Sequence, residues 1–520
     1  MPVICRFSRL SISFDDQPLL RNLDASLGPG ITALVGPNGR GKSVLLKLLA
    51  GVVAPNAGTI QWQQPVYRVD QLQRLPEGRV AEALGVAALH DTFQRIERGA
   101  AAPSDLDRVA ALWHLPSQWQ QQLVEAGLEV DLDSVAATLS GGQQSRLALC
   151  AAFLRTDHYL LLDEPSNHLD ATGRQWLIDR LRAHPGGALV ASHDRALLRE
   201  ADTILELRAD GLRRHGGGFD AYRAEREREA AALEQRITDA EKQRRRLREE
   251  SRAAAERAAK RRRQGERQRR SGSQSKLLLD ASAERAQDHS GRLKAAQAQR
   301  EAHVGQRLQQ DRSQRDTLPA QRLPLAGGAE GSAVRLHLEA IALPWVARTP
   351  ISLTLRAGER WRVQGPNGCG KSTLLKIMAG RLAPRAGSCR RHGACVYLDQ
   401  NFSLLDPARS AVDNLRQLHP EAADTDWRTR LGSLRLRGDK ALLPLSALSG
   451  GERLKVALLA VTGGAESPGL LLLDEPDNHL DLDSGELLER ALQSYAGTLV
   501  VVSHDEAFVA GIGVTRTLAL

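Results

Sequence analysis

The stretch GPNGRGKS at Gly36–Ser43 recurs as GPNGCGKS at Gly365–Ser372, and this doubling decides the architecture of the chain. A glycine-rich loop of this composition holds phosphate groups with its backbone N–H groups. Its lysine reaches the β- and γ-phosphates, and its serine hydroxyl is a ligand for Mg²⁺. The repeat therefore predicts two phosphate-binding loops, and so two bound nucleotides, in one polypeptide.

Each loop follows a predicted apolar strand, at residues 31–35 and 361–364, and precedes a leucine-rich helical run. This strand–loop–helix context is what the motif requires. The predicted nucleotide contacts in the first loop are Gly36, Pro37, Asn38, Gly39, Arg40, Gly41, Lys42 and Ser43. Those in the second loop are Gly365, Pro366, Asn367, Gly368, Cys369, Gly370, Lys371 and Ser372.

Downstream of each loop, an apolar strand ends in a pair of carboxylates, Asp163-Glu164 and Asp474-Glu475. Asp163 and Asp474 are expected to support Mg²⁺, while Glu164 and Glu475 polarise the attacking water as general bases. An isolated Asp-Glu pair would more simply be a solvated strand end. Its pairing with a phosphate loop, twice in one chain, favours the catalytic interpretation.

A Ser-Gly-Gly triplet opens a helix-forming segment between each loop and its carboxylate pair. The N–H groups at a helix N-terminus attract anions, so the triplets are predicted to contact phosphate. A single triplet would be only a helix cap, but this one recurs at the same place in both copies. The residues are Ser140, Gly141 and Gly142 in the first copy and Ser449, Gly450 and Gly451 in the second.

This order of motifs resembles the ATP-binding cassette superfamily, and the resemblance covers both copies. It implies a glutamine that senses Mg²⁺ and water, and a switch histidine that contacts the γ-phosphate. These residues are Gln71 and Gln400, and His193 and His504, the histidines following predicted strands at 188–191 and 499–502. Phe14 and Trp345 stand where the superfamily places an aromatic that stacks on adenine, and a core position is the alternative for both.

The resemblance further implies that the two copies pair head to tail within one monomer. One composite site would then use Lys42, Glu164, His193 and Ser449, and the other would use Lys371, Glu475, His504 and Ser140. Both sets are complete, so both sites are expected to hydrolyse ATP with Mg²⁺. The loops after the catalytic glutamates, Ser-Asn-His-Leu-Asp at 166–170 and Asp-Asn-His-Leu-Asp at 477–481, also match the superfamily.

The charge of the chain is concentrated between the copies. Residues 221–320 hold 26 basic and 16 acidic side chains, and the segment 242–276 alone holds 15 basic and 4 acidic ones. We expect an α/β domain at 1–220, a basic arm at 221–320 and a second α/β domain at 321–520. The arm is predicted as two antiparallel helices at 222–270 and 276–312, turning at 271–275. A disordered charged linker is the alternative.

Two smaller expectations concern packing. Leu233, Ile237 and Leu247 are predicted to form a seam between the helices of the arm. The motif spacing shows about 20 extra residues in the first copy between Gln71 and Ser140. Trp113 and Trp119 lie in this interval, and we expect core positions for both, with a projecting insertion as the alternative.

Two cassettes joined by a basic helical linker resemble the ABC-F family, whose members act on the ribosome. This resemblance implies contact with ribosomal RNA and tRNA, and arginine suits phosphate recognition because its guanidinium binds two oxygens at once. The predicted RNA-binding residues are Arg261, Arg262, Arg263, Arg269 and Arg270. The five scattered cysteines predict no zinc site, and the lack of a long apolar run predicts a cytoplasmic chain that does not enter a membrane.

Two other functions remain as alternatives. Some ATPase subunits of membrane importers are tandem cassettes of this length, but they lack a basic helical linker of about 100 residues. Chromosome and repair ATPases insert coiled coils within one cassette or carry zinc modules, whereas this arm lies between the copies.

Overall fold

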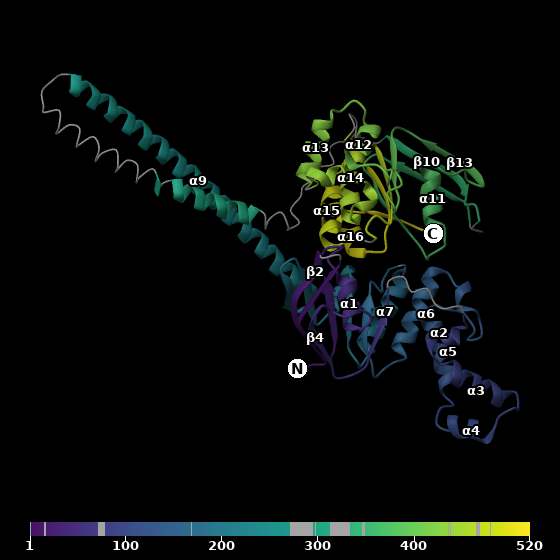
Figure 1. The fold of residues 1–520 in the computed structure, drawn as a ribbon. Helices are drawn as coiled ribbons and strands as arrows, with labels where there is room; N and C mark the ends of the chain where they lie inside the picture. Colours follow the sequence, from purple (N-terminus) through teal and green to yellow (C-terminus); the bar gives the residue numbers. More distant parts are fainter. Residues whose placement is uncertain are drawn as a thin grey trace. The chain divides into compact units, whose positions relative to one another are not determined.

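Each copy of the repeated motifs forms one small antiparallel sheet and one larger, mainly parallel sheet (Figure 1). The computed structural model describes residues 2–520 except 15–16, 71–77, 168, 271–294, 297, 313–332, 346–348, 435, 437, 464–467 and 479. The chain divides into two compact units, Met1–Tyr222 with Gln321–Leu520, and Arg223–Ala320. The α/β class and the long helix between the copies are confirmed.

In the first copy the antiparallel sheet has the strand order β2-β1-β4, and the larger sheet has the order β5-β6-β7-β3-β8-β9. Only β9 runs antiparallel to its neighbour in the larger sheet. The strands are β1 (Cys5–Phe14), β2 (Gln17–Leu27), β3 (Ile31–Val35), β4 (Ala57–Trp62), β5 (Val66–Val69), β6 (Tyr159–Asp163), β7 (Ala188–Ala191), β8 (Thr203–Arg208) and β9 (Gly211–Gly216).

The second copy repeats this plan with the orders β11-β10-β13 and β14-β15-β16-β12-β17. All strand pairs in its larger sheet are parallel. The strands are β10 (Val334–Ala342), β11 (Ile351–Arg356), β12 (Arg360–Gln364), β13 (Ala386–Arg391), β14 (Cys395–Leu398), β15 (Leu470–Asp474), β16 (Thr498–Val502) and β17 (Arg516–Ala519). The strands predicted before the phosphate loops and the histidines are therefore correct to within one residue.

Helices connect these parallel strands. Those of the first copy are α1 (Lys42–Leu49), α2 (Val80–Leu84), α3 (Ala87–Glu97), α4 (Pro103–Val109), α5 (Leu115–Glu125), α6 (Gly141–Phe153), α7 (Ala171–Ala183) and α8 (Arg195–Arg199). Those of the second copy are α11 (Lys371–Met378), α12 (Ala411–Leu418), α13 (Asp424–Ser433), α14 (Gly450–Thr462), α15 (Leu482–Gln493) and α16 (Glu506–Gly511).

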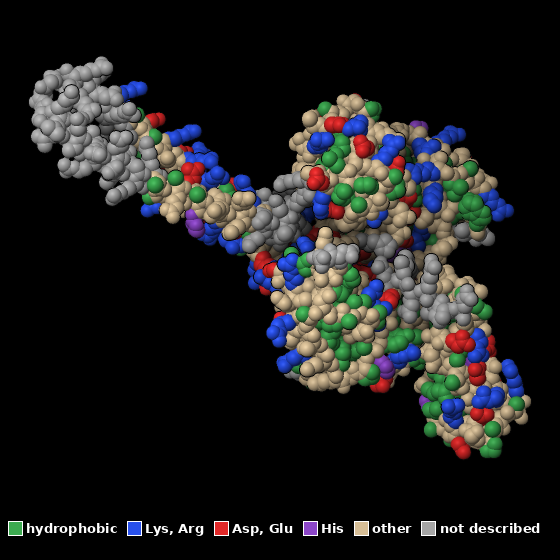
Figure 2. All heavy atoms as spheres, viewed as in Figure 1, with side chains coloured by type: hydrophobic (Ala, Val, Ile, Leu, Met, Phe, Trp, Pro, Cys, Tyr) green, Lys and Arg blue, Asp and Glu red, His purple; other side chains and the backbone are tan. Residues whose placement is uncertain are grey.

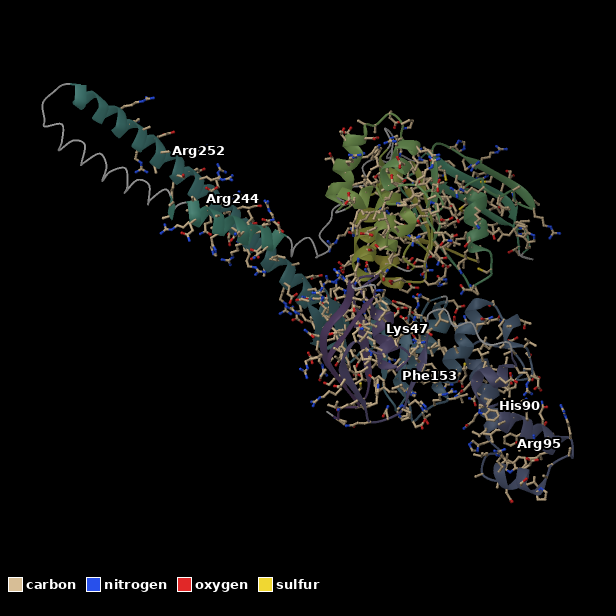
Figure 3. All side chains as sticks on the ribbon, viewed as in Figure 1. Lys47, His90, Arg95, Phe153, Arg244 and Arg252 are labelled. Atoms are coloured by element: carbon tan, nitrogen blue, oxygen red, sulfur yellow. The ribbon has the colours of Figure 1, made fainter. Side chains whose placement is uncertain are left out.

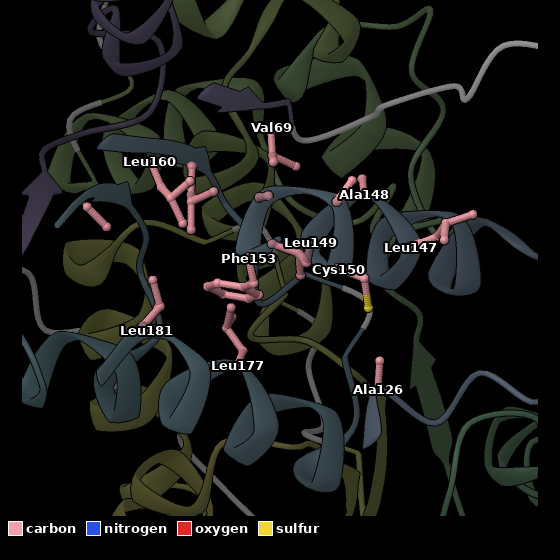
Figure 4. Packing of buried hydrophobic residues seen from close by; sticks show 14 of the residues in the cluster. Val69, Ala126, Leu147, Ala148, Leu149, Cys150, Phe153, Leu160, Leu177 and Leu181 are labelled. Carbon is pink, nitrogen blue, oxygen red and sulfur yellow. The ribbon is translucent and has the colours of Figure 1, made fainter. Parts of the chain in front are cut away.

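The central strands of the larger sheet in the first copy are mainly apolar because both of their faces are covered. One face packs against α6 and α7, and the other packs against α1 and the antiparallel sheet. Every residue of β3 and β6 is buried. Figure 4 shows Phe153 of α6 among Leu160 of β6 and Leu177 and Leu181 of α7. This packing holds the strands in register, and their carboxyl ends meet at one edge of the sheet, where ligands of such sheets bind.

The arm contains helix α9 (Gly218–Arg270), which begins four residues earlier than predicted. The early start follows from Phe219 and Tyr222, which are buried in the core of the first copy, where the Tyr222 hydroxyl lies 3.2 Å from Glu206 Oε1. Residues 295–296 and 298–312 are also helical, and the residues that follow 312 lie outside the described part of the chain. The predicted turn at 271–275 and the start at 276 lie outside the described residues.

Within the arm, Leu233, Ile237, Ala240 and Leu308 form a small buried cluster, so two of the three seam residues are confirmed. Leu247 is only half-buried and lies outside this cluster. Two ion pairs also join the helices, Arg248 Nε to Glu301 Oε1 at 2.7 Å and Arg312 Nη2 to Glu241 Oε1 at 2.6 Å. Lys and Arg side chains run along the described part of α9, including Arg244 and Arg252 (Figures 2 and 3).

The interval that holds the extra residues of the first copy contains helices α2, α3, α4 and α5, where the second copy has α12 and α13. Trp119 is 3% exposed and belongs to the core, as expected. The expectation for Trp113 is wrong, because this residue is 55% exposed, although its ring makes an edge-type contact with Phe93. Arg95, labelled in Figure 3, ties α3 to α4 through an ion pair of 2.7 Å with Asp105.

We predict that Trp119→Ala destabilises this helical segment by about 3–5 kcal/mol, because it leaves a large cavity against Phe93. Trp113→Ala is the matched control, and its exposed ring should cost less than about 1 kcal/mol. Amide hydrogen exchange of α3 and α5 in the full chain measures the local opening free energy of each variant. Equal protection in the two variants would contradict the assignment of Trp119 to the core.

Candidate active site

The two phosphate loops have nearly identical backbones. Gly41 and Gly370 cap α1 and α11 with φ of 100° and 99°, a left-handed conformation that favours glycine. A Cβ atom added to Gly39 or Gly368 would meet nothing within 4 Å, so open space lies beside the loop backbone. These loops therefore offer helix N-terminal N–H groups beside open space, which fits a phosphate group.

Both loop lysines are buried and turn back onto their own loops. Lys42 Nζ donates to the carbonyl of Gly36 at 2.7 Å, and Lys371 Nζ donates to the carbonyl of Gly365 at 2.8 Å. Lys42 Nζ also lies 2.9 Å from Nε2 of His193. Burial lowers the pKa of Lys42, while the nearby carboxylates of Glu164, Asp481 and Asp163 oppose this shift. A phosphate oxygen is the same kind of acceptor as the loop carbonyls, so these lysines are placed to bind one.

Serine and aspartate meet at each expected Mg²⁺ position. Ser372 Oγ donates to Asp474 Oδ1 at 3.0 Å, and Ser43 hydrogen-bonds to Asp163. A hydroxyl beside a carboxylate fits Mg²⁺, which needs only one or two protein oxygens when phosphates and water complete its shell. The described residues contain no group of three or more His, Cys, Asp or Glu side chains that could hold a metal ion by themselves.

The two proposed catalytic glutamates share an unusual backbone conformation that the sequence does not reveal. Glu164 and Glu475 both have φ of 48°, in the left-handed region that glutamate rarely adopts. Hydrogen bonds from their own N–H groups to the carbonyls of Ala191 and Val502 fix this turn in both copies. Strained backbone of this kind clusters at active sites, because the surrounding structure must enforce it.

Each glutamate lies beside its predicted switch histidine. His193 Nε2 is 3.5 Å from Glu164 Oε1, and His504 Nε2 is 3.7 Å from Glu475 Oε1. Burial lowers the pKa of His504 to about 4, with further lowering by Lys371 and Arg174. Burial also lowers the pKa of His193 and raises that of Glu164. Both histidines are therefore neutral near pH 7 and keep one ring nitrogen as an acceptor and one as a donor.

A cavity of about 650 Å³ brings residues of both copies together. The predicted site residues that line it are Asn38, Gly39, Gly41, Lys42, Ser43, Asp163, Glu164, His193, Asn367, Glu475 and His504. Its lining does not include Lys371, Ser372, Ser140 or Ser449. The composite pairing of each phosphate loop with the opposite Ser-Gly-Gly triplet therefore stays a prediction.

Asp481 is a site residue that sequence reasoning missed. Its Oδ2 accepts a hydrogen bond of 3.1 Å from the backbone N–H of Asn38, in the phosphate loop of the other copy. Two further contacts join the copies: Arg174 Nη1 donates to the carbonyl of His504 at 2.9 Å, and Arg195 pairs with Glu489 at 2.8 Å. Asp481 ends the Asp-Asn-His-Leu-Asp stretch, so its motif was visible but its partner was not.

The Ser-Gly-Gly triplets cap helices in the same way in both copies. The N–H groups of Gln143 and Glu452 donate to the hydroxyls of Ser140 and Ser449, at 3.4 and 3.3 Å. The side chains of Gln143 and Glu452 accept from the serine N–H groups, which completes a capping box in each copy. The triplets therefore stand at the N-termini of α6 and α14, as predicted.

The remaining predicted residues differ in how far the structure describes them. Phe14 is 50% exposed and Trp345 is 84% exposed, so the core alternative is wrong for both and stacking on adenine stays a proposal. Gln71 and the side chains of Arg261, Arg262, Arg269 and Arg270 lie outside the described residues. Arg263 is exposed on α9, and Gln400, after β14, is half-buried.

Comparison with known proteins supports the prediction that both copies are ATP-binding cassettes. A family model described as ABC transporter matches residues 20–167 and 349–478. The tylosin resistance ATP-binding protein TlrC of Streptomyces fradiae is 33% identical, over 95% of this chain and 93% of that protein. The energy-dependent translational throttle protein EttA of Mycobacterium tuberculosis is 31% identical, over 95% of this chain and 87% of that protein.

The similarity extends to another relative that matches nearly the whole of this chain and to a solved structure. The ATP-binding protein Uup of Haemophilus influenzae is 30% identical, over 96% of this chain and 76% of that protein. The structure of an archaeal ribosome recycling factor, in complex with a ribosomal stalk protein, has a TM-score of 0.60 and 19% identity. It covers 98% of this chain and 87% of the factor, a likeness of fold alone. No helix among the described residues has the length and apolar character that a bilayer crossing needs.

Asp477, which lines the cavity, gives a prediction about pH. Ser503 Oγ donates to its carboxylate at 2.8 Å, but burial and the nearby Asp505 raise the pKa of Asp477 to about 7. Between pH of about 4 and 7 the folded chain keeps a proton that the unfolded chain has lost, so Asp477 lowers stability as pH rises. Replacing it with serine, which the first copy carries as Ser166, should remove this loss.

The measurement is the melting temperature of Asp477→Ser and of the unsubstituted chain between pH 5 and 8. We expect the variant to gain relative stability as pH rises through this range. Ser166→Asp is the matched reverse change and should add a loss of stability over the same range. A difference in melting temperature that does not vary with pH would contradict the raised pKa of Asp477.

Proposed function

Because the chain belongs to the ABC-F family of tandem ATP-binding cassette ATPases, we propose that it couples ATP hydrolysis to ribosome binding, as a translation or antibiotic-resistance factor. The chain binds ATP and hydrolyses it to ADP and phosphate. The observation that carries the proposal is the basic arm, with its excess of 11 positive charges over residues 242–276, placed between two complete cassettes.

At each site the residues divide the work of hydrolysis. In the first cassette the loop N–H groups and Lys42 would hold the β- and γ-phosphates, while Ser43 and Asp163 would hold Mg²⁺. Mg²⁺ held there would supply positive charge to offset the negative charge that develops on the phosphate oxygens. Glu164 accepts a proton from the attacking water, and His193, 3.5 Å from Glu164, holds the γ-phosphate end in place.

The second cassette supplies the same set through Lys371, Ser372, Asp474, Glu475 and His504. In the proposed head-to-tail arrangement, Ser449 completes the first site and Ser140 completes the second. The helix N-termini that these serines cap would then stabilise the γ-phosphate from the side opposite the lysine. Phe14 and Trp345 would stack on the two adenines, since both rings are exposed.

Two lines of support favour the ribosome as partner. RNA offers closely spaced phosphates, and an arginine-rich helix binds them with strong salt dependence. Relatives that match nearly the whole chain carry names that refer to translational throttling and to resistance against tylosin. A ribosomal partner would place the chain in the cytoplasm. No observation favours the importer alternative, and the 53-residue helix α9 between the cassettes speaks against it.

We predict that Glu164→Gln with Glu475→Gln leaves ATP bound but lowers turnover by about 10²-fold or more, because both general bases are lost. With ATP, this variant should sediment with ribosomes more completely than the unsubstituted chain. Glu97→Gln with Glu339→Gln is the matched control, since these glutamates are exposed, one in each cassette. Undiminished turnover would refute the catalytic role, and no sedimentation with ribosomes would refute the partner.

A separate prediction concerns the arm. Changing Arg261, Arg262, Arg263, Arg269 and Arg270 to glutamine should weaken ribosome binding while basal ATP hydrolysis stays unchanged. Each lost phosphate contact should lower the slope of log affinity against log salt by about 0.7–0.9. The control replaces five exposed arginines of the cassettes, Arg6, Arg21, Arg385, Arg390 and Arg428. Unchanged binding and salt dependence in the arm variant would refute the RNA-binding role.

A further inference from the structure

The two cassettes differ at one buried position beside the proposed Mg²⁺ site. Arg68 is the third residue of β5 and lies opposite Leu161 of β6. Tyr397 is the third residue of β14 and lies opposite Leu472 of β15. Because β6 and β15 end in Asp163 and Asp474 at the same distance from these leucines, Arg68 and Tyr397 occupy equivalent places.

In the second cassette, Tyr397 holds the aspartate directly. Its hydroxyl donates to Asp474 Oδ2 at 2.9 Å, while Ser372 Oγ donates to Asp474 Oδ1 at 3.0 Å. Tyr397 is only 3% exposed, and the guanidinium of Arg381 lies 4.9 Å from its ring centre. With a donor on each oxygen, the carboxylate of Asp474 has one fixed orientation.

In the first cassette, the equivalent side chain turns to a different partner. Arg68 Nη2 pairs with Asp70 Oδ2 at 2.6 Å. The tyrosine of this strand stands one position earlier, where the ring of Tyr67 packs under the guanidinium of Arg155 at 4.1 Å. Asp163 is as deeply buried as Asp474 and keeps its hydrogen bond with Ser43, but an arginine replaces the phenol.

We propose that Tyr397 is a positioning residue that orients Asp474 toward Mg²⁺, and that the second site consequently binds Mg²⁺ with nucleotide more tightly than the first. This inference rests on the proposed role of Ser372 and Asp474 in holding Mg²⁺. Side chains that fix the orientation of a metal-binding group typically change metal affinity by about 10–100-fold. The Ser372 hydroxyl directs its proton toward Asp474 in a hydrogen bond. The lone pairs of the Ser372 oxygen are therefore left for the cation.

The test is the binding of a fluorescent ATP analogue by the full chain, titrated with Mg²⁺ and repeated in EDTA. Lys42→Ala weakens the first site and Lys371→Ala the second, so each background reports mainly one site. In the Lys42→Ala background, Tyr397→Phe should raise the half-saturating Mg²⁺ concentration about 10-fold or more. Nucleotide affinity in EDTA should change less than about 2-fold, because the phenol acts through Asp474 and the metal.

The controls separate an effect on the orientation of Asp474 from an effect on folding. Tyr67→Phe, the same change one position earlier in the matching strand, should leave the Mg²⁺ dependence of both sites unchanged. The Lys371→Ala background, which reports the first site, should need more Mg²⁺ than the Lys42→Ala background. An equal loss of affinity in Mg²⁺ and in EDTA for Tyr397→Phe would overturn the positioning role in favour of a structural one.

Two results distinguish failure of this inference from failure of its premise. Mg²⁺-dependent binding in the unsubstituted chain that Tyr397→Phe leaves unchanged would overturn the role of Tyr397 alone. Binding that shows no dependence on Mg²⁺ in the unsubstituted chain would overturn both the Mg²⁺ assignment and the role of Tyr397.

Discussion

The structure depends on one constraint. A lysine ammonium must be buried at the carboxyl edge of each parallel sheet and still have hydrogen-bond acceptors. Lys42 and Lys371 are 8% and 6% exposed, and the carbonyls of their own loops accept their hydrogen bonds. A buried charge without such partners would cost several kcal/mol. Three features serve this arrangement: the left-handed glycines, the strands that lead into the loops and the carboxylates beside the lysines.

Most of the fold and much of the candidate site could be predicted from the sequence, because the chemistry repeats. The phosphate loops, the strands before them and the carboxylate pairs appear twice with matched spacing, and the helical character of residues 222–270 followed from their helix-forming composition. Local sequence signals decide such features, since a strand, a loop and a helix N-terminus each depend on neighbouring residues.

What could not be predicted depends on contacts between distant residues. The left-handed φ of Glu164 and Glu475 is imposed by hydrogen bonds to the next strand, and no residue preference announces it. The bond from Asn38 to Asp481 joins positions 443 residues apart. Trp113 and Trp119 are the same residue type in the same interval, so the sequence predicted core positions for both. Only the packing of α3, α4 and α5 makes Trp113 exposed and Trp119 buried.

The repeat therefore yields two sites that share their catalytic groups but differ in what surrounds them, as the exchange of Arg68 for Tyr397 illustrates. The central claim is that each cassette holds its own nucleotide. Equilibrium dialysis of the Glu164→Gln, Glu475→Gln chain against saturating ATP and Mg²⁺ tests this most directly, because it counts the nucleotides bound per chain. The account predicts two ATP molecules per chain, and a plateau at one would contradict it.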